Sequence, residues 1–434
     1  MDAPGNPRPV GLERLDGSAR MKSLVTPPKI RVAVYTTTHC NWGGSYQYAG
    51  AVITALAGLP REAYEVRVWH EDATWATLLD RLQIPGLVAS EYVVPARFRP
   101  TVRTFMRLQQ EGKLTEEQSN ELLSLVSRFS NLSRLVEWKP HVVVLPQMRY
   151  PLSIPGARHI GVIHDLMHRY ERSFPEAASP DQVRHRERLF TATLEKCDRV
   201  LVDSRVGAEH VLESYPQTER SRLRILPFAA FEDILTCSPR RPRMEIPQKF
   251  LFYPAQFWKH KNHAGLARAV ARLRKDLPDI HIVAAGNTGQ NGFDDFRAIV
   301  AACGLESAFS LPGYVSTEEL AWLYRHARAL VMPTFFGPTN IPPMEAMAFG
   351  CPVAVSGIYG MPEQCADAAL YFNPAKVKEM AEVMGLLWTD DALCDELRER
   401  GKRRAEQWSF EDFYRSVRAV VAKLACGMDR EEHP

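Results

Sequence analysis

The stretch LVMPTFFGPTNIPPMEAMAFGCPVAVS (residues 330–356) joins two apolar runs through a polar loop and a short helical pattern. LVMPT and PVAVS are typical of buried strands. Between them, Asn340 is a suitable N-cap, Pro342 or Pro343 fits a first helical turn, and Gly350 is a suitable stop. The stretch therefore predicts a helix whose N-terminus lies at the carboxyl end of a strand, where open α/β sheets bind ligands.

The N-terminus of this predicted helix suits a phosphate or diphosphate, because it presents unpaired N–H groups and a partial positive charge. Glu345 stands in the first turn, and a carboxylate there would repel a phosphate. It can instead accept hydrogen bonds from a neighbouring diol, such as the ribose of a nucleotide. The alternative is that Glu345 only complements the helix dipole.

Short β-branched runs alternate with helical patterns along the whole chain, which is typical of parallel sheets. Two series of strands are expected, one on each side of the proline-rich, basic segment SPRRPRMEIPQ. They are 30–37, 64–70, 141–146, 158–165, 198–204 and 222–228 before it, and 249–257, 279–286, 328–334, 352–357 and 369–374 after it. We predict an α/β fold with two Rossmann-like doubly wound domains that face each other across a cleft. The expected limits are a disordered tail at 1–28, domains at 29–237 and 249–408, a linker at 238–248, and a helix at 409–426 that packs back across the domains.

Composition excludes several classes of protein. Lys and Arg number 54 against 51 Asp and Glu, so the net charge of +3 gives no field for wrapping nucleic acid. The eight cysteines form no C-x-x-C pair, which favours reduced thiols in a cytoplasm over disulfides or zinc. Neither a membrane span nor a secretion signal is predicted, and no Asp-x-Asp or paired histidine spacing indicates a metal.

Two further segments of the second domain point toward a nucleotide. Lys261 lies in the loop FYPAQFWKHKNH after an expected strand, where it can pair with a diphosphate or simply be a solvated lysine. In LPGYVSTEELAWLYRHA, a turn precedes a helix. There Gly313, Tyr314 and Val315 can border a base, or can begin a packed helix.

Together these residues resemble the second domain of the family four retaining, nucleotide-sugar-dependent glycosyltransferases, which have the GT-B fold. The similarity runs in order through most of residues 30–425 and is strongest in 249–374. The resemblance implies that Glu345 holds the ribose and that Lys261 holds the diphosphate. It also implies that the loop of residues 313–315 borders the base.

The first half of the chain agrees with this resemblance. Gly43 and Gly44 precede a predicted helix, where bare backbone can approach phosphate or sugar, although a plain tight turn is the alternative. GVIHDLMHRYERSFPE resembles the family's H-D-L segment, which implies that His164 touches the donor sugar. A lone histidine at a strand end is otherwise usually structural, and Asp165 can serve only to orient its loop.

The chain also departs from the family pattern. Many members have a second Glu eight residues before the helix Glu, and that place is Gly337 here. The usual Arg five residues before the diphosphate Lys is Gln256. The missing positive charge can be replaced by Lys259, by His260 or by N–H groups at Thr339, Asn340 and Ile341.

The implied activity is retaining transfer of mannose or another hexose from a nucleoside diphosphate sugar to a hydroxyl of a saccharide or lipid-linked acceptor, in polysaccharide or glycolipid assembly. No cofactor or metal is implied, and no carboxylate in the cleft motifs is placed as a nucleophile. A catalytically inactive sugar-nucleotide-binding partner protein is the main alternative. A nucleotide-dependent oxidoreductase needs a glycine fingerprint that is missing, and an extracellular binding protein needs an export signal.

The basic, aromatic segment ARFRPTVRTFMR (96–107) suggests either peripheral contact with the inner face of a membrane or a solvated helix face.

Overall fold

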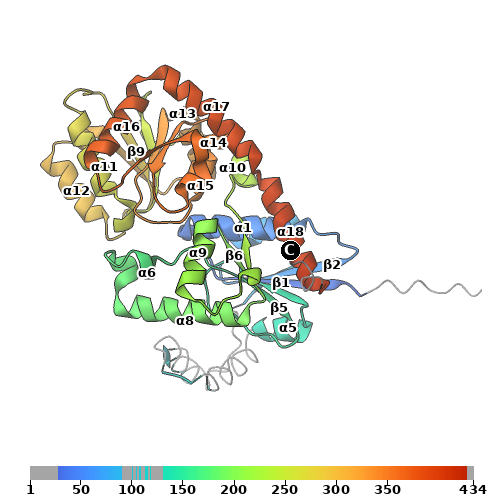
Figure 1. The fold of residues 1–434 in the computed structure, drawn as a ribbon. Helices are drawn as coiled ribbons and strands as arrows, with labels where there is room; N and C mark the ends of the chain where they lie inside the picture. Colours follow the sequence, from blue (N-terminus) through green and yellow to red (C-terminus); the bar gives the residue numbers. More distant parts are fainter. Residues whose placement is uncertain are drawn as a thin grey trace, which may run out of the picture.

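The computed structural model describes residues 28–89, residues 131–427 and isolated positions between 100 and 118. Two parallel β-sheets, each with its own helices, form two lobes joined by short connections (Figure 1). The predicted α/β fold with two Rossmann-like sheets is therefore confirmed. The limits 29–237, 238–248 and 249–408 stay a prediction, and segment 96–107 lies largely outside the described residues.

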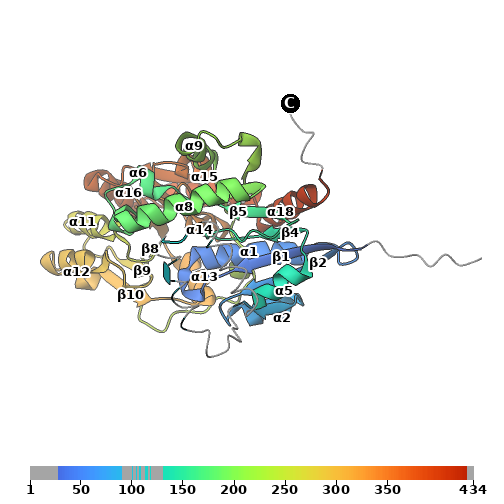
Figure 2. The same ribbon diagram turned by 90° about the horizontal axis from the view of Figure 1, so that it is seen from below.

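The first sheet has the strand order β3-β2-β1-β4-β5-β6-β7, and every neighbouring pair is parallel. Its apolar residues alternate between the two faces, as burial on both sides of a sheet requires. Helices α1 and α18 cover one face, while α5, α8 and α9 cover the other (Figures 1 and 2). The strands are β1 (Ile30–Thr36), β2 (Tyr64–His70), β3 (Gly86–Val88), β4 (Val142–Val144), β5 (Arg158–Val162), β6 (Arg199–Val202) and β7 (Leu223–Ile225).

The second sheet has the order β10-β9-β8-β11-β12-β13 and is also parallel throughout. Its core is continuous through the strands and the helices packed on them, with aromatic side chains from β8 at its centre. The strands are β8 (Leu251–Pro254), β9 (Ile282–Ala285), β10 (Phe309–Gly313), β11 (Ala329–Met332), β12 (Val353–Ser356) and β13 (Ala369–Phe372).

Most helices connect consecutive strands on the outside of both sheets, while α16, α17 and α18 follow the last strand, β13. In the first half of the chain they are α1 (Gly44–Ala57), α2 (Trp75–Leu82), α5 (Asn131–Trp138), α6 (Met167–Tyr170), α7 (Pro175–Ala178), α8 (Pro180–Lys196), α9 (Arg205–Ser214) and α10 (Glu232–Thr236). In the second half they are α11 (His263–Leu273), α12 (Phe293–Ala302), α13 (Thr317–His326), α14 (Ile341–Ala348), α15 (Met361–Cys365), α16 (Val377–Thr389), α17 (Asp391–Gln407) and α18 (Phe410–Ala425).

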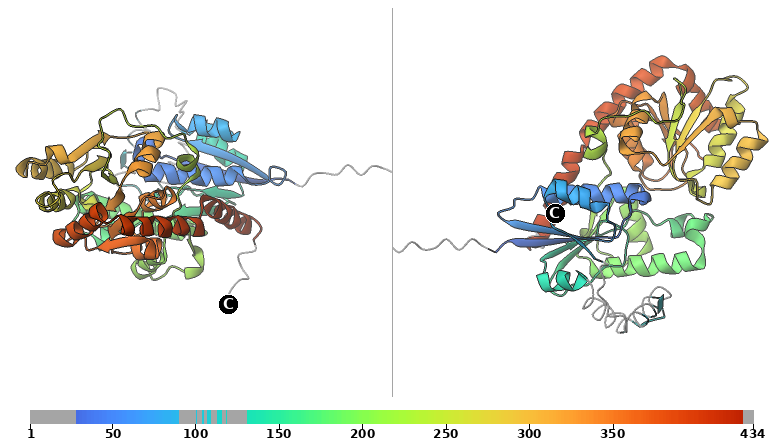
Figure 3. Two further views of the ribbon diagram at one scale, coloured as in Figure 1. Left: turned by 90° about the horizontal axis from the view of Figure 1, so that it is seen from above. Right: turned by 180° about the vertical axis from the view of Figure 1, so that it is seen from behind.

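The end of the chain returns to the first lobe. Helix α17 packs on α14 of the second lobe, and α18 then packs on α1 of the first (Figure 3). A capping box between Ser409 and Asp412 starts α18, whose apolar face includes Phe413 and Val417 in the core of the first sheet. Helix α18 therefore ties the two lobes together.

Two observed strands, β3 and β10, are absent from the sequence prediction. The run Gly86–Val88 is three residues long and half-exposed at the sheet edge, so it lacks the apolar signature of a strand. The loop expected before the helix at 317 is in fact β10, which ends at Gly313 with a left-handed φ of 73°. Both misses occur at sheet edges, where burial no longer dictates composition.

The strand, helix and strand predicted from residues 330–356 are confirmed as β11, α14 and β12. Gly350 follows the helix with a φ of 69°, as a left-handed stop requires. The predicted place of Glu345 in the first turn is wrong, because α14 begins at Ile341 and Glu345 is its fifth residue. It lies one turn deeper in the protein than expected.

Candidate functional site

In each sheet the strand order reverses between two neighbouring strands, β1 and β4 in the first sheet and β8 and β11 in the second. These two places lie next to each other in space. Ligands of open α/β sheets bind at such points, beyond the carboxyl ends of the strands. A cavity of about 480 Å³ lies there between the lobes. All but one of the predicted site residues line it: Gly43, Gly44, His164, Gln256, Lys261, Tyr314, Val315, Thr339, Asn340, Ile341 and Glu345. The exception is Gly313, which turns the chain at the end of β10.

Glu345 lies at the inner end of this cavity and is only 1% exposed. The hydroxyl of Tyr324 donates to its Oε2 at 2.7 Å, and Nε2 of Gln47 donates to its Oε1 at 3.4 Å. Burial raises the pKa of Glu345 to about 7, and these two bonds only partly offset that effect. Its depth does not suit a purely dipolar role at the helix end, because that effect is confined to the first turn.

Lys261 ends a short 3-10 helix, Lys259–Lys261, after β8. Its Nζ donates to Oδ1 of Asn340 at 3.1 Å, and no ion pair of this ammonium occurs among the residues that the structure describes. Burial lowers the pKa of Lys261 to about 8, although the charge of nearby Asp165 opposes the shift. The cavity thus holds a cation that lacks a bonded counter-ion within the described chain, which favours an anionic ligand.

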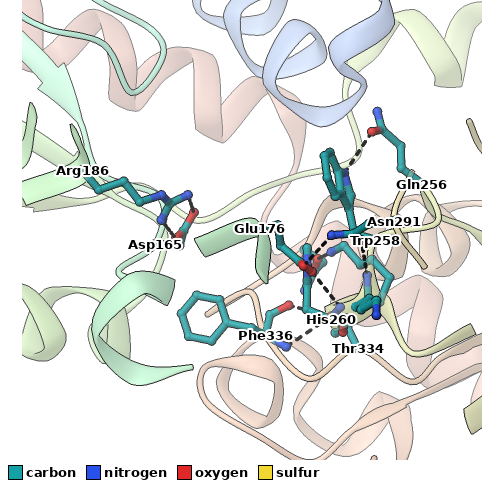
Figure 4. A network of polar contacts seen from close by, with 12 residues as sticks. Asp165, Glu176, Arg186, Gln256, Trp258, His260, Asn291, Thr334 and Phe336 are labelled. Atoms are coloured by element: carbon teal, nitrogen blue, oxygen red, sulfur yellow. Dashed lines mark hydrogen bonds and ion pairs between the residues drawn. The ribbon is translucent and has the colours of Figure 1, made fainter. Parts of the chain in front are cut away.

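The neighbours of Lys261 do not supply the missing positive charge. Nζ of Lys259 pairs with Asp295 at 3.1 Å on the surface and does not line the cavity. His260 does line it, but its N–H and Nδ1 both bond to Oε1 of Glu176, at 2.9 and 2.6 Å (Figure 4). Burial and then Lys261 lower the pKa of His260 more than Glu176 raises it.

Gln256, which replaces the expected Arg, is part of a local polar network. Its Oε1 accepts from Nε1 of Trp258 at 3.1 Å and from Nε2 of Gln290 at 3.5 Å (Figure 4). The amide faces Gly43 across the cleft, because a Cβ added at Gly43 would lie 3.6 Å from Nε2 of Gln256. Gln256 can offer a donor to a ligand, but no charge.

The N-terminus of α14 offers fewer N–H groups than we expected. Pro342 and Pro343 have none, and the N–H of Asn340 donates to Oε1 of Gln364 at 3.0 Å. A helix start leaves four N–H groups without intrahelical partners, which here would belong to residues 340–343. Only that of Ile341 remains for a ligand. An anion at this end therefore depends on Lys261 more than on the helix.

Thr339, just before this helix, is bound to the first lobe. Its N–H donates to Oδ2 of Asp203 at 3.0 Å, and its hydroxyl donates to the same oxygen. Burial raises the pKa of Asp203 to about 6, against the bonds from Thr339 and Ser204. Thr339 therefore joins the lobes beside the cavity.

His164 follows β5 and is packed edge-on against Tyr48, with ring centroids 4.6 Å apart. Burial lowers the pKa of His164 to about 4, so the ring is neutral at pH 7. Its Nε2 is buried and has no hydrogen-bond partner among the described residues. Because an unpartnered buried polar atom is costly, this nitrogen is a ready contact for a ligand hydroxyl.

Asp165 next to it forms a partly buried ion pair with Arg186 (Figure 4). It also accepts from the N–H of Met167 at 2.9 Å. Burial alone would raise the pKa of Asp165, but Arg186 and the N–H of Met167 lower it to about 2. The carboxylate is thus ionised and satisfied by groups of its own lobe, which agrees with a role in orienting the loop.

A second cavity of about 340 Å³ adjoins the first and shares His164 and Lys261 with it. Gly337 lines this cavity at the place where the resemblance expects a Glu. Its φ is 119°, and an added Cβ would lie 2.8 Å from Nδ2 of Asn340. A Glu cannot replace this glycine without moving Asn340, so the local backbone differs from what the family pattern implies.

Sequence reasoning missed several residues of the site, among them Gln47, Glu176, Asp203, Tyr324 and Gln364. Tyr324 lies at a buried position of α13, and only the need of its hydroxyl for a partner could have drawn attention to it. Glu176 and Asp203 come from the other lobe, and nothing in the local sequence indicates their contacts.

Residues 240–407 match the family model described as glycosyl transferases group 1. This part of the chain is therefore similar to that family. The match contains α14 and the loop of Lys261, so the resemblance drawn from these residues is confirmed.

Curated relatives extend the glycosyltransferase similarity toward the first lobe. The chain is 26% identical over 271 residues to O-antigen chain mannosyltransferase B of Escherichia coli, covering 57% of this chain and 69% of that one. It is 24% identical over 228 residues to the serotype-specific mannosyltransferase WbdA of Escherichia coli. That match covers 50% of this chain but only 28% of WbdA. These relatives support a role in sugar transfer.

Solved structures show the same fold over nearly the whole chain. Anabaena HepE, in complex with UDP and glucose, has a TM-score of 0.67 at 12% identity and covers 91% of this chain and all of its own. WaaG, a glycosyltransferase involved in lipopolysaccharide biosynthesis, has a TM-score of 0.63 at 16% identity, covering 90% and 99%. The glycosyltransferase domain thus sits within a complete GT-B fold. Among the described residues, no helix is long and apolar enough to cross a bilayer.

Proposed function

We propose that this protein is a retaining hexosyltransferase that moves a sugar from a nucleoside diphosphate sugar to a hydroxyl acceptor without a metal. The observation that carries the proposal is the meeting of Lys261, Glu345 and His164 in one cavity between the two sheets. They supply a cation, a hydrogen-bond acceptor and an imidazole with an unpartnered nitrogen. These three groups complement a diphosphate, a ribose and a sugar hydroxyl.

The roles follow from this chemistry. Lys261 exchanges its neutral partner Asn340 for the diphosphate and stabilises the charge that grows on the leaving phosphate. Glu345, held by Tyr324, accepts hydrogen bonds from the ribose hydroxyls. His164, neutral at pH 7, contacts a hydroxyl of the transferred sugar. Loss of one such charge-stabilising contact costs roughly 3 kcal/mol of transition-state stabilisation.

Retention of configuration is proposed through attack on the same face that the phosphate leaves, with that phosphate accepting the proton of the acceptor hydroxyl. A double displacement needs a carboxylate free to attack the anomeric carbon. Among the described residues, the carboxylates that line the two cavities are already bonded: Glu345 to Tyr324, Asp165 to Arg186 and Glu176 to His260. None of them is well suited to be a nucleophile.

Mannose is the first candidate for the sugar, because two relatives are mannosyltransferases. A uridine base has separate support, since the Anabaena HepE structure holds UDP.

The donor is best identified by calorimetric titration of the purified protein with UDP, GDP, ADP and dTDP, each with and without magnesium. Selective binding of one diphosphate at equal affinity with and without magnesium is expected. Binding that requires magnesium would overturn metal independence, and no binding at all would overturn the site assignment.

The acceptor is proposed to be a growing saccharide or a lipid-linked sugar, bound against the first lobe during polysaccharide or glycolipid assembly. The O-antigen and lipopolysaccharide functions in the names of two similar proteins support this class. We also propose that the protein is cytoplasmic and that its basic segment 96–107 contacts the inner face of a membrane. That segment lies largely outside the residues that the structure describes.

A sugar-nucleotide-binding partner protein without catalysis is the second candidate, because Gly337 and Gln256 each remove a contact expected from the family. Incubation of the intact donor with acceptor saccharides separates the two. Formation of a glycosylated product shows an enzyme, whereas tight nucleotide binding without turnover of any donor tested favours the partner protein.

A further inference from the structure

Three side chains of the kinds that can bind a metal ion meet beyond the carboxyl ends of strands β1 and β2, outside the lining of the main cavity. His39 and Cys40 follow β1, and Asp72 follows the neighbouring parallel strand β2. Nδ1 of His39 lies 3.1 Å from Oδ2 of Asp72 and 3.6 Å from Sγ of Cys40. The three possible ligand atoms all lie within 4.8 Å of one another. Strands β1 and β2 end in register, with Thr36 opposite His70, and this brings the loops together.

Two of these distances are close to the ligand-to-ligand distances of a tetrahedral zinc site. With Zn–N near 2.1 Å, Zn–S near 2.3 Å and Zn–O near 2.1 Å, the edges of the tetrahedron are roughly 3.4 to 3.6 Å. The spacings from His39 to Asp72 and to Cys40 fall within a few tenths of an ångström of these values. Imidazole, thiolate and carboxylate together are a zinc-type ligand set rather than one for magnesium or calcium.

We propose that His39, Cys40 and Asp72 form a binding site for zinc or a similar transition metal, with three protein ligands and a fourth position open to water. The protein already orients the carboxylate for this task. Oδ1 of Asp72 accepts from the N–H of Thr74 at 2.9 Å, and Oδ2 accepts from the N–H of Cys40 at 3.2 Å. Such outer contacts fix ligand geometry in metal sites.

One further observation agrees with this assignment. The side chain of His39 is 53% exposed, which gives a metal ion access from solvent.

The place of the site gives it a structural consequence. The loop of His39 and Cys40 leads directly to Gly43 in the wall of the main cavity. From the other lobe, the hydroxyl of Tyr314 donates to the carbonyl of Cys40 at 3.1 Å. A bound metal would therefore link the loop that leads to Gly43 with the loop after β2, and would stabilise the contact with Tyr314. It takes no part in the transfer chemistry, for which no metal is proposed.

Sequence analysis did not predict this site, because the expectation of no metal depended on spacing within single segments. Asp72 instead lies 32 residues after Cys40, in a second loop that only the parallel pairing of β1 and β2 brings close to the first.

Titration with Co²⁺, followed by absorption spectroscopy, tests the proposal. The protein is freed of any histidine tag and kept reduced. One equivalent of Co²⁺ is expected to give the near-ultraviolet band of a thiolate–cobalt bond and the strong visible bands of tetrahedral cobalt, and Zn²⁺ should displace it. Cys40→Ser should abolish the thiolate band, while the control Cys303→Ser, at an exposed cysteine elsewhere, should keep it.

His39→Ala and Asp72→Asn separate a metal site from a lone reactive thiol. Each is expected to weaken Co²⁺ binding by more than about tenfold, since even outer-shell changes cost 10- to 100-fold. His39 is half-exposed, so its variant is expected to fold even if Cys40→Ser does not. The proposal is overturned if the parent gives no thiolate–cobalt band, if Cys40→Ser retains it, or if neither His39→Ala nor Asp72→Asn changes the affinity.

Discussion

Tyr324 donates its hydroxyl hydrogen to Oε2 of Glu345 over 2.7 Å, at a place where the two side chains are 0% and 1% exposed. The pair joins α13 to α14 beneath the cavity and holds a carboxylate where water is largely excluded. Because burial raises the pKa of Glu345 to about 7, the unliganded protein bears a cost whenever this group is ionised. A ligand with hydroxyl donors relieves that cost.

The variant Glu345→Gln tests this cost through the pH dependence of stability. The folded-state pKa of Glu345 is about 7, above its ordinary 4.5, so the folded protein binds this proton more tightly than the unfolded chain. The cost of ionisation is therefore absent below about pH 4.5 and complete above about pH 7. The unfolding free energy of Glu345→Gln relative to the parent should rise across this window, by at most ~3 kcal/mol. Urea unfolding at pH 4.5 and pH 8 measures it.

The control for that variant is Asp181→Asn, at a carboxylate that is 90% exposed. Its stability relative to the parent should be the same at both pH values. If Glu345→Gln behaves like this control, the carboxylate is not desolvated in solution.

Lys261→Ala should weaken binding of the nucleoside diphosphate while leaving binding of the nucleoside nearly unchanged. Among the described residues, Lys261 is the only Lys or Arg that lines the main cavity. A hydrogen bond to a charged group contributes ~1.5–3 kcal/mol, or about 10- to 100-fold in affinity. Lys259→Ala is a matched control two residues away, because its ammonium pairs with Asp295 on the surface. Calorimetry on both variants decides the point. Equal losses in the two would mean that only overall charge matters.

Much of the fold was predictable because buried parallel strands leave a strong apolar signal. The four strands that form the switch points, β1, β4, β8 and β11, come from such runs, and every neighbouring strand pair of the two sheets is parallel. The edge strands β3 and β10 were missed because one is half-exposed and the other ends in a glycine turn. Helix α14 was predicted from its prolines and Gly350, but its first residue was not, and Glu345 was therefore placed one turn too early.

The candidate site was predictable where a residue follows a strand, as Lys261 and His164 do, or lies in a helix with clear start and stop signals, as Glu345 does. Contacts between the lobes were not predictable. Thr339 bonds to Asp203 from 136 residues away, and local sequence carries no trace of such a pairing. Nor does composition reveal that the amide of Asn340 leaves no room for a side chain at Gly337.

His164→Ala should lower the rate of sugar transfer more than the affinity for the nucleotide. The imidazole is assigned to the sugar, and loss of one hydrogen bond from a ligand hydroxyl costs ~1–2 kcal/mol, or about 5- to 30-fold in kcat. The pKa of His164 is lowered to about 4, so this ring does not change its charge near pH 6.5. Near that pH, the curves of transfer rate against pH should therefore have the same shape in the parent and the variant. Initial rates from pH 5 to pH 9 with intact donor, together with calorimetry on the diphosphate, provide both readouts.

The exposed His185, on α8, supplies the control, and His185→Ala should leave rate and binding unchanged. An equal loss of diphosphate affinity and rate in His164→Ala would place the ring against the nucleotide rather than the sugar.

Glu176 joins the lobes through the backbone and side chain of His260 and through Nδ2 of Asn291 at 3.2 Å, as Figure 4 shows. Burial alone would raise the pKa of Glu176, but its bonds to His260 lower it to about 2. Its stabilising effect is therefore present above pH 4.5 and is lost as the pH falls toward 2.

Removal of this carboxylate should let the lobes separate. In Glu176→Ala the N–H of His260 loses its partner, at a cost of about 1–3 kcal/mol, which is enough to populate open forms. Small-angle X-ray scattering at pH 7 should give a larger radius of gyration for Glu176→Ala than for the parent, and saturating nucleoside diphosphate should bring the two together. Asp181→Ala, at an exposed acidic residue five positions on, should scatter like the parent. If Glu176→Ala also scatters like the parent without ligand, the remaining contacts, such as Thr339 to Asp203, are sufficient to keep the lobes closed.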